Sequence, residues 1–472
     1  MEKVGVLVVS YGARAAAMID AFARSQNYQL EIYVADKQRN PFNLKRAKAH
    51  VVIPDLNIEQ ICKLAKRYKH KIDFGIVGPE KPIIEGIRDV VENETDIPLI
   101  CPTKEYAIEA SKVAQRLLFQ KVVPEINPKF KVFDPKDYST TTAAKKEVNK
   151  WLDEIGSNVV VKPDRPAAGK GVGVWGDHFN TRKELLEHFM SDIEYGPVII
   201  EEKIDGEESS FQAFCDGKHL VPLPETRDYK RAFDGDKGPN TGGMGSYKDV
   251  GDVLPFMTTV DKEREIEIVN KIFKELRKRA TNTDLRGIPF YDAFIHTSIG
   301  PKVLENNSRP GDPEIQNLLP ILKDDFVDVC YKMLEGNLTR VDFDEKATVL
   351  TYKAPPNYSG FADTFPERVK TDEVSKPVNL GPAEKLAEKY GDAIRIYPAS
   401  MELREDGNVY TLKSRAVCVV GVGNSIHDAR EISLEGVKTI TGGALWNRTD
   451  IASREHIRKS IEHMRKLRLS KR

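Results

Sequence analysis

Short apolar strands alternate with helices over the N-terminal part of the chain, and this alternation restricts the possible folds more than any other feature. Residues 4–9 form a continuous apolar run, typical of a parallel strand that is buried on both faces. An alanine-rich helix follows, and later apolar strands are expected at 32–35, 51–53 and 74–77. The alternation predicts a doubly wound α/β domain with a parallel sheet that ends near Pro102. No G-x-G-x-x-G motif follows the first strand, so a dinucleotide-binding fold is not supported.

The whole chain is too long to share one hydrophobic core. A length of 472 residues favours about two to four domains. After the N-terminal domain at 1–102, the pattern of strands and helices predicts a mixed α+β core at 103–125 and 198–340. A flap subdomain is expected at 126–197, and a small C-terminal α/β domain at 341–472.

The charge balance argues against nucleic acid and membrane as partners. Lysine plus arginine number 72 and aspartate plus glutamate also number 72, so the net charge is zero. No apolar segment approaches the roughly 18 residues that a membrane-spanning helix needs. The five cysteines are scattered without C-x-x-C spacing and are typical of reduced thiols, and no signal peptide precedes the first strand. These features predict a cytoplasmic protein.

The segment Asp234–Gly245 is the most unusual part of the chain. It combines two carboxylates, a proline and five glycines within twelve residues. Glycine permits positive φ and lets backbone N–H groups approach a ligand closely. With Lys230 and Arg231 just before it, the segment indicates a loop that holds an anion. A mobile surface loop is the alternative that composition alone leaves open.

A second candidate anion site follows an apolar strand that ends at Lys162. The position before Pro163 favours a lysine that either pairs with a fixed anion or extends to water. The glycine-rich run Gly169–Gly173 comes next, which favours the anion. It is not a Walker loop, because Lys170 is followed by Gly171 where that motif requires Ser or Thr. The segment is therefore interpreted as a flap over a bound anion.

A third polar group lies on a predicted strand near residue 305. Glu305 and Asn307 are two residues apart, so their side chains point to one face of the strand. Carboxylate and amide oxygens suit Mg²⁺, which binds few protein groups together with nucleotide phosphates. Arg309 lies on the same face and suits bidentate binding of a carboxylate or an acyl phosphate. A purely structural acidic strand end is the alternative.

Taken together, these segments resemble the ATP-grasp ligases, and more narrowly the phosphoribosylamine–glycine ligase family. The matching segments are Val159–Val174, Glu201–Ser210, Asp228–Gly245 and Gly300–Gln316, with Val77–Glu80 near the start and Gly442–Ile451 near the end. Residues 397–402 look like the archaeal branch. The resemblance covers nearly the whole chain. It implies an N-terminal phosphoribosylamine domain, an ATP-grasp core with its flap, and a small C-terminal domain.

The resemblance also implies the reaction. Glycine would be ligated to 5-phospho-D-ribosylamine at the expense of ATP, through glycyl phosphate, giving glycinamide ribonucleotide, ADP and phosphate in the second step of de novo purine synthesis. ATP and Mg²⁺ or Mn²⁺ are the implied cofactors, and the protein would be a monomer or a weak homodimer. Two alternatives stay open: an ATP-grasp ligase with a different amine substrate, and a non-catalytic nucleotide-binding relative.

The resemblance also implies roles for individual residues. The residues implied for ATP are Lys112, Lys162, Gly169, Lys170, Gly171, Glu201, Ile204 and Glu208. Those implied for the phosphoribosylamine and glycine are Gly12, Arg14, Gly78, Pro79, Glu80, Lys230, Asn240 and Arg309. Catalytic roles fall to Arg309, Lys162 and Asp228, and metal binding to Glu305 and Asn307.

The chain departs from the family pattern in three places. Its first turn reads Gly12-Ala13-Arg14-Ala15-Ala16, where the family usually has Gly-Gly-Arg-Glu-His. It has Arg227-Asp228-Tyr229-Lys230 in place of Gln-Asp-His-Lys. Ala293 stands where archaeal relatives often place a glutamine metal ligand, and the adjacent Asp292 is expected to face the other way.

Overall fold

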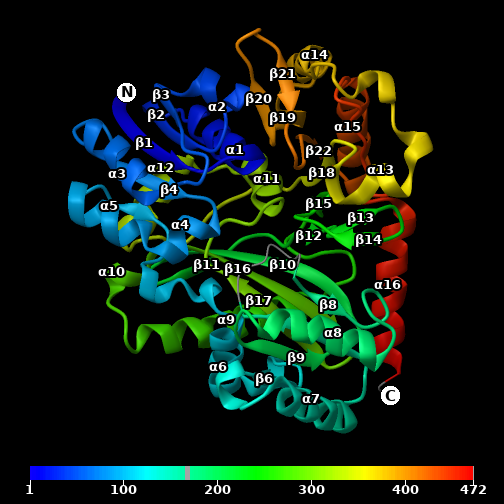
Figure 1. The fold of residues 1–472 in the computed structure, drawn as a ribbon. Coiled ribbons are helices and arrows are strands. Elements are labelled where there is room, and N and C mark those ends of the chain that lie inside the picture. The colour runs from blue at the N-terminus through cyan, green and yellow to red at the C-terminus, as the bar shows by residue number, and fades with distance from the viewer. Residues whose placement is uncertain (165–170, 471–472) are drawn as a thin grey trace.

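The computed structural model describes residues 1–164 and 171–470. In Figure 1 the N-terminal domain lies at the upper left, the C-terminal domain at the upper right and the flap subdomain at the bottom, with the core sheet between them.

A five-stranded parallel sheet, in the order β3-β2-β1-β4-β5, forms the N-terminal domain. Its elements are β1 (Glu2–Val9), α1 (Gly12–Ala23), β2 (Tyr28–Asp36), α2 (Pro41–Arg46), β3 (Ala49–Val52), α3 (Ile58–Arg67), β4 (Phe74–Val77), α4 (Glu80–Glu85), α5 (Ile87–Thr95) and β5 (Leu99–Ile100). Val6 and Val8 pack in one cluster with α1, whereas Leu7 and Val9 pack in another with α3 and α5. Because both faces of β1 are covered, its sequence is apolar without a break. The predicted doubly wound domain is confirmed.

The flap subdomain is an antiparallel sheet in the order β6-β9-β7-β8, covered by two helices. Its elements are β6 (Phe130–Phe133), α7 (Thr141–Ile155), β7 (Val159–Pro163), β8 (Gly173–Val174), α8 (Arg182–Ile193) and β9 (Val198–Glu202). The sequence prediction assigned β9 to the core, but β9 pairs with β6 and β7 of the flap. The reason is apolar packing, because Val198 and Ile200 belong to the cluster that α7 and α8 cover.

A four-stranded antiparallel sheet in the order β11-β10-β16-β17 forms the core. Its elements are α6 (Lys112–Val122), β10 (Glu207–Asp216), β11 (Leu220–Pro222), α9 (Thr259–Arg277), α10 (Asn282–Leu285), β16 (Arg286–Thr297), β17 (Gly300–Asn307), α11 (Glu314–Leu318) and α12 (Phe326–Glu335). Helices α6 and α9 cover one face through residues such as Phe119 and Ile272. The strand predicted around Glu305 and Asn307 is β17.

The C-terminal sheet takes strands from both sides of the expected boundary at residue 340. Its order is β12-β15-β18-β22-β19, and β15 pairs antiparallel with β18. The elements are β12 (Arg227–Asp228), β13 (Arg231–Phe233), β14 (Lys237–Asn240), β15 (Gly245–Lys248), β18 (Ala347–Lys353), α13 (Phe361–Thr364), α14 (Gly381–Tyr390), β19 (Ile394–Pro398), β20 (Met401–Leu403), β21 (Val409–Thr411), β22 (Val417–Gly423), α15 (Ile426–Thr439) and α16 (Arg454–Leu469). Core and C-terminal domain are therefore joined by main-chain hydrogen bonds.

Helix α16 runs from the C-terminal domain along the side of the core, as Figure 1 shows in red. His463 Nδ1 lies 2.7 Å from Glu207 Oε1 on β10, and Arg468 Nη2 lies 2.7 Å from Asp261 Oδ2 on α9. Polar contacts thus hold the helix to the core. No helix in the described part of the chain has the length and apolar character needed to cross a membrane.

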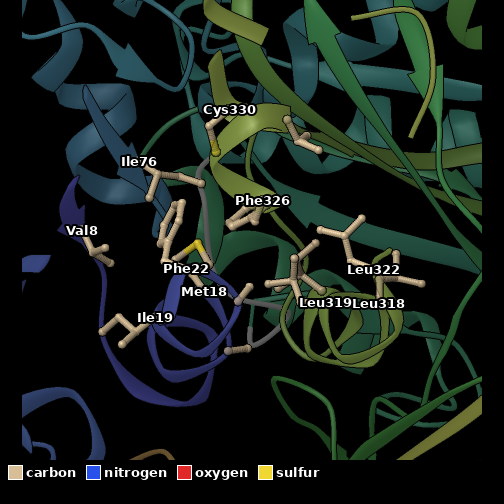
Figure 2. Packing of buried hydrophobic residues seen from close by; sticks show 14 of the residues in the cluster. Val8, Met18, Ile19, Phe22, Ile76, Leu318, Leu319, Leu322, Phe326 and Cys330 are labelled. Carbon is tan, nitrogen blue, oxygen red and sulfur yellow. The ribbon is translucent and has the colours of Figure 1, made fainter. Parts of the chain in front are cut away.

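One apolar cluster packs the N-terminal domain against the core (Figure 2). Helix α1 contributes Met18, Ile19 and Phe22, and the α11–α12 region contributes residues that include Leu318 and Phe326. The ring centroids of Phe22 and Phe326 lie 4.7 Å apart. This packing fixes α1, and with it the turn that precedes the helix, relative to the end of β17.

Candidate active site

A cavity of about 590 Å³ lies where the N-terminal domain, the flap, the core sheet and the C-terminal domain meet. It is lined by thirteen residues that the sequence analysis singled out: Arg14, Glu80, Lys112, Lys162, Glu201, Ile204, Glu208, Asp228, Lys230, Asn240, Glu305, Asn307 and Arg309. Gly12, Gly78, Pro79 and Gly171 are not part of the lining that the described residues form. Gly169 and Lys170 lie outside the described residues. Motifs far apart in the sequence thus meet in one place.

Lys162 enters the cavity from the end of β7 and pairs with Glu201 on the neighbouring β9. Its Nζ lies 2.5 Å from Glu201 Oε1, and Arg116 Nε and Nη2 donate to the two carboxylate oxygens at 2.8 and 3.1 Å. Burial alone would raise the pKa of Glu201, but the charges of Arg116 and Lys162 lower it to about 2. Burial lowers the pKa of Lys162. Two cations on one carboxylate leave one positive charge toward the cavity.

Glu201 was expected to hold adenosine, and its two oxygens are instead bound by Arg116 and Lys162 in this structure. Arg116, on α6, was missed by the sequence analysis. It is 3% exposed and also donates to the carbonyls of Val303 and Leu304 on β17. Its only sequence signal is an arginine on an amphipathic helix, a position that is usually solvated.

The carboxylate of Glu305 is surrounded by cationic side chains. Burial would raise its pKa, but Lys230, Lys112 and Lys162 together bring it below its ordinary value. A carboxylate that stays ionised in a buried pocket suits a divalent cation. Asn307 is also buried, and its Nδ2 has no hydrogen-bond partner in the described part of the chain.

The register of β16 and β17 explains the alanine beside this pair. Ala293 lies directly opposite Glu305, and Tyr291 lies opposite Asn307. Asp292 pairs with Asn306 on the other face, where Asn306 Nδ2 donates to Asp292 Oδ1 at 2.5 Å. Asp292 therefore faces away from Glu305, as expected. Among residues 1–164 and 171–470, no three His, Cys, Asp or Glu side chains cluster as metal ligands.

Arg309 joins the core to the N-terminal domain. Its Nε lies 3.0 Å from Glu109 Oε1 and 3.3 Å from Glu80 Oε2. Glu109 was not predicted as a site residue, although it precedes the expected Lys112 by three positions. The two carboxylates beside the Arg309 guanidinium fix its plane. The N–H groups that they do not bind therefore point in defined directions.

The first-domain turns form the wall next to Arg309. Arg14 Nη1 donates to the carbonyl of Pro310 at 3.0 Å, and its Nε has no partner among the described residues. A Cβ at Gly78 would lie 2.3 Å from Ser10 Oγ and 3.0 Å from Arg14 Nε, so only glycine fits there. Gly12 and Gly78 thus shape the turn around Arg14 rather than line the cavity.

A lysine and two carboxylates, Lys230, Glu208 and Asp228, occupy the opposite wall. Lys230 Nζ donates to Glu208 Oε2 at 2.8 Å. Burial, with the nearby Glu314 carboxylate, raises the pKa of Asp228 well above its ordinary value. Asp228 Oδ1 has no hydrogen-bond partner in the part of the chain that is described. Asp228 is therefore a partly buried carboxyl group that retains a proton more readily than an exposed one.

The segment Asp234–Gly245 contains the turn and the second strand of the β13–β14 hairpin, and then the return to β15. Its two carboxylates face the protein: Asp234 accepts from Thr449 N and Oγ1 at 2.8 and 2.7 Å, and Asp236 accepts from Arg448 Nη2 at 2.9 Å. His456 Nε2 lies 2.6 Å from Asp236. The hairpin is thus tied to the C-terminal domain, which argues against a free surface loop.

Arg415, from the C-terminal domain, was not predicted and also lines the cavity. Its Nη1 donates to the carbonyls of Gly242 and Gly243 at 2.6 and 2.9 Å, and its Nη2 donates to Asp312 Oδ2 at 3.2 Å. No local motif marks this arginine, because its partners lie more than a hundred residues earlier in the chain.

Comparison with known proteins agrees with this arrangement. The phosphoribosylglycinamide synthetase N-domain model matches residues 4–109, and the ATP-grasp (A) domain model of the same family matches residues 128–315. A phosphoribosylamine–glycine ligase of Methanocella arvoryzae is 37% identical over 98% of this chain and 99% of that protein. One from Thermococcus kodakarensis is 36% identical over 98% and 99%.

The chain belongs to the phosphoribosylglycinamide synthetase family. A crystal structure of phosphoribosylamine–glycine ligase from Thermotoga maritima matches with a TM-score of 0.72 at 24% identity, covering 95% of this chain and all of that one. A biotin carboxylase from Campylobacter jejuni matches with a TM-score of 0.65 at 14% identity, over 98% and 95%. Membership of the synthetase family confirms the expected ligase class and the ATP-grasp fold. ATP-grasp enzymes use ATP, typically with a divalent metal ion.

Proposed function

We propose that this protein ligates glycine to 5-phospho-D-ribosylamine, with ATP converted to ADP and phosphate, and so forms glycinamide ribonucleotide. The single observation that carries the proposal is the meeting of Lys162, Glu305 and Arg309 in one cavity with Arg14 and Lys230. The full-length similarity to proteins named phosphoribosylamine–glycine ligase supports the same substrates.

One end of the cavity would bind ATP, and the other end would bind glycine and the phosphoribosylamine. Lys112, Lys162 and the flap segment 169–171 would hold the phosphates of ATP, and Ile204 and Glu208 follow β9 where adenosine would bind. The residual positive charge beside Glu201 supports phosphate binding at this end. Phosphoryl transfer needs positioning and charge neutralisation more than a protein base.

Arg309 would orient the glycine carboxylate, whose oxygen takes the phosphoryl group to give glycyl phosphate. Its contacts with Glu109 and Glu80 restrain the guanidinium. A restrained guanidinium would hold the glycine carboxylate in a geometry suited to phosphoryl transfer. Closing the flap would exclude water from the acyl phosphate.

The amine nitrogen of the phosphoribosylamine would then displace phosphate. Arg14, with its turns at Gly12 and Gly78–Glu80, would hold the phosphorylated sugar, with Asn240 and Lys230 on the opposite side. The ionised form of Asp228 would accept the proton that the nitrogen loses, because the raised pKa of this carboxyl group makes its carboxylate a stronger base.

The donor set fits a divalent cation. Glu305 is a partly buried carboxylate kept ionised by lysines, and Asn307 Nδ2 has no hydrogen-bond partner among the described residues, so no bond from this nitrogen prevents the amide from turning its oxygen inward. We infer Mg²⁺ or Mn²⁺, which would neutralise the phosphate charges when bound. Because Ala293 stands opposite Glu305, water would fill the remaining coordination positions. We further propose that the protein is cytoplasmic and that it is a monomer or a weak homodimer.

The test is ADP release from ATP and Mg²⁺, with glycine and phosphoribosylamine generated in situ, each omitted in turn. ADP formation that requires both, with a matching amide product, supports the proposal. ATP turnover that needs glycine but ignores the phosphoribosylamine would point to a different amine. No turnover with intact nucleotide binding would favour the non-catalytic alternative.

A further inference from the structure

Arg415 reaches the cavity from the C-terminal domain, just before β22. Its side chain is 13% exposed. Three of its hydrogen bonds go to protein groups: the carbonyls of Gly242 and Gly243, and the carboxylate of Asp312. The ring of Tyr352 covers the guanidinium, with 4.4 Å between the guanidinium carbon and the ring centroid. Protein acceptors thus engage three of the five N–H groups of Arg415, which restrains the position of its guanidinium.

The first contact fixes a turn that has no room for side chains. A Cβ at Gly242 would lie 2.9 Å from Arg415 Nη2. Gly243 has a φ of +98°, and a Cβ there would lie 2.4 Å from Asp228 Oδ1. The backbone of the turn therefore packs directly on the Asp228 carboxyl group on one side and on the Arg415 guanidinium on the other.

The second contact fixes the loop that follows β17. Asp312 accepts hydrogen bonds from Gln316 Nε2 at 2.9 Å and from Tyr352 OH at 3.0 Å, in addition to Arg415. The same loop presents the Pro310 carbonyl to Arg14. Movement of Asp312 would therefore disturb the contact that holds Arg14.

We propose that Arg415 is a positioning residue for the amine-binding half of the site: it holds the Gly242–Gly243 turn against Asp228 and holds the Asp312 loop against Arg14. The assignment rests on the function proposed above. The C-terminal domain thus completes the site for the amine substrate, whereas the flap and core hold ATP. Neither contact of Arg415 involves Lys162 or Glu305, so its loss should spare the ATP half.

The kinetic test compares Arg415→Met, Arg415→Lys and Arg404→Met. Arg404 is a matched control, because it also lies over a tyrosine ring in the C-terminal domain, 4.1 Å from the Tyr410 centroid, and it is not part of the cavity lining formed by the described residues. We expect Arg415→Met to raise the KM for phosphoribosylamine about tenfold or more while the KM values for ATP and glycine change less than about twofold. Arg415→Lys should give a smaller rise, and Arg404→Met none. Equal rises in all three KM values would overturn the assignment.

A second readout does not depend on activity. Hydrogen–deuterium exchange of the peptide around Gly242 and Gly243 should be faster in Arg415→Met and unchanged in Arg404→Met. Exchange at the wild-type rate would overturn the assignment, even if catalysis were impaired. If Arg415→Met does not fold, Gly242→Ala, which presses on the guanidinium from the other side, should produce the same faster exchange. If the wild type makes no ADP with phosphoribosylamine, the proposed function fails, while the exchange comparison still decides the role of Arg415.

Discussion

Lys162 and Arg116 share one carboxylate: Glu201 accepts from Arg116 on one side and lies 2.5 Å from Lys162 Nζ on the other. All three side chains are nearly buried. The arrangement supplies both stability and a cation that faces the end of the cavity where we propose that ATP binds, and these two roles respond differently to substitution.

Glu201→Gln should lower the free energy of unfolding by about 3–5 kcal/mol, because it leaves the buried Arg116 without its counter-charge. Urea unfolding at pH 7 measures the change. Glu147→Gln, at an exposed pair with Lys150, is the control and should change stability by less than about 1 kcal/mol.

Lys162→Met should instead raise the KM for ATP with a smaller loss of stability, and an unchanged KM would contradict the proposed phosphate contact.

Glu305→Gln should reduce kcat at least about 100-fold and raise the Mg²⁺ concentration needed for half-maximal activity, since a neutral amide binds a divalent cation less tightly than a carboxylate. Initial rates across a Mg²⁺ titration measure both effects. Asp292→Asn is a matched control on the adjacent strand, because Asp292 is buried but faces the opposite side. A normal metal requirement in Glu305→Gln would remove Glu305 from the proposed metal site.

Arg309→Lys should raise the KM for glycine and lower kcat about 100-fold, because an ammonium cannot bind Glu109 and a substrate carboxylate in one plane. Steady-state kinetics with each substrate varied in turn measures the split. Arg286→Lys is the control, since Arg286 also pairs with an N-terminal-domain acid, Glu92 at 3.3 Å, but does not belong to the cavity lining seen in the described residues. Similar losses in both variants would argue for a structural role of Arg309.

A buried acidic pair in the core should make stability depend on pH. Glu225 lies 2.8 Å from Lys262 Nζ, and Glu265 accepts from Ser209 Oγ at 2.8 Å and lies 2.9 Å from His296 Nε2. Burial raises the pKa of both carboxyl groups from 4.5 to about 8, with Glu265 adding repulsion at Glu225. Burial lowers the pKa of His296 from 6.5 to about 4.

Between pH 6.5 and 8 the folded protein therefore holds protons on this pair that the unfolded chain has lost. The free energy of unfolding should fall as the pH rises through this window, by up to about 1.4 kcal/mol per pH unit for each carboxyl group. His296 is neutral in the folded state throughout this window, whereas the unfolded imidazole still binds part of a proton near pH 6.5, so it offsets the fall at the lower end and adds little slope toward pH 8. Urea unfolding at several pH values should show a shallower dependence in Glu265→Gln than in the wild type. An equal slope would contradict the raised pKa of Glu265.

The ion pairs of Arg448, which hold the β13–β14 hairpin to the C-terminal domain, should be essential for stability. Arg448 is wholly buried and pairs with Asp236 at 2.9 Å and Asp450 at 2.7 Å. Arg448→Met should lower the melting temperature by several degrees, because two partly buried carboxylates lose their partner. Calorimetry measures the shift. Arg458→Met, at an exposed pair with Glu462 on α16, should leave it nearly unchanged.

The sequence predicted the residues whose neighbours in the chain reveal their chemistry. Lys162 follows an apolar strand, and Glu305 and Asn307 alternate on one strand, so local periodicity and composition identified them. Arg116 and Arg415 have no such neighbours: they meet Glu201 and Gly242 only through the packing of separate domains. Tertiary partners of this kind leave no local pattern.

The domain limits show the same distinction. The parallel sheet was predictable because strands and helices alternate within a short stretch of chain. The C-terminal sheet was not, since β15 pairs with β18 about a hundred residues later, and β9 joins the flap because Val198 and Ile200 complete its apolar cluster. Pairing between distant strands depends on which faces become buried, which periodicity in one segment does not reveal.

Asp236 and Arg448, whose contact holds the β13–β14 hairpin to the C-terminal domain, lie 212 residues apart in the chain. Because a protein is synthesised from its N-terminus and domains fold as they emerge, the glycine hairpin leaves the ribosome long before Arg448 and Arg415 exist. A nascent chain that already has its flap and core would therefore carry a hairpin whose Asp236 carboxylate does not yet have Arg448 beside it. The hairpin and the turn over Asp228 reach their final positions only once the C-terminal domain has been made, so a stalled or truncated product would lack the contacts that Arg448 and Arg415 supply.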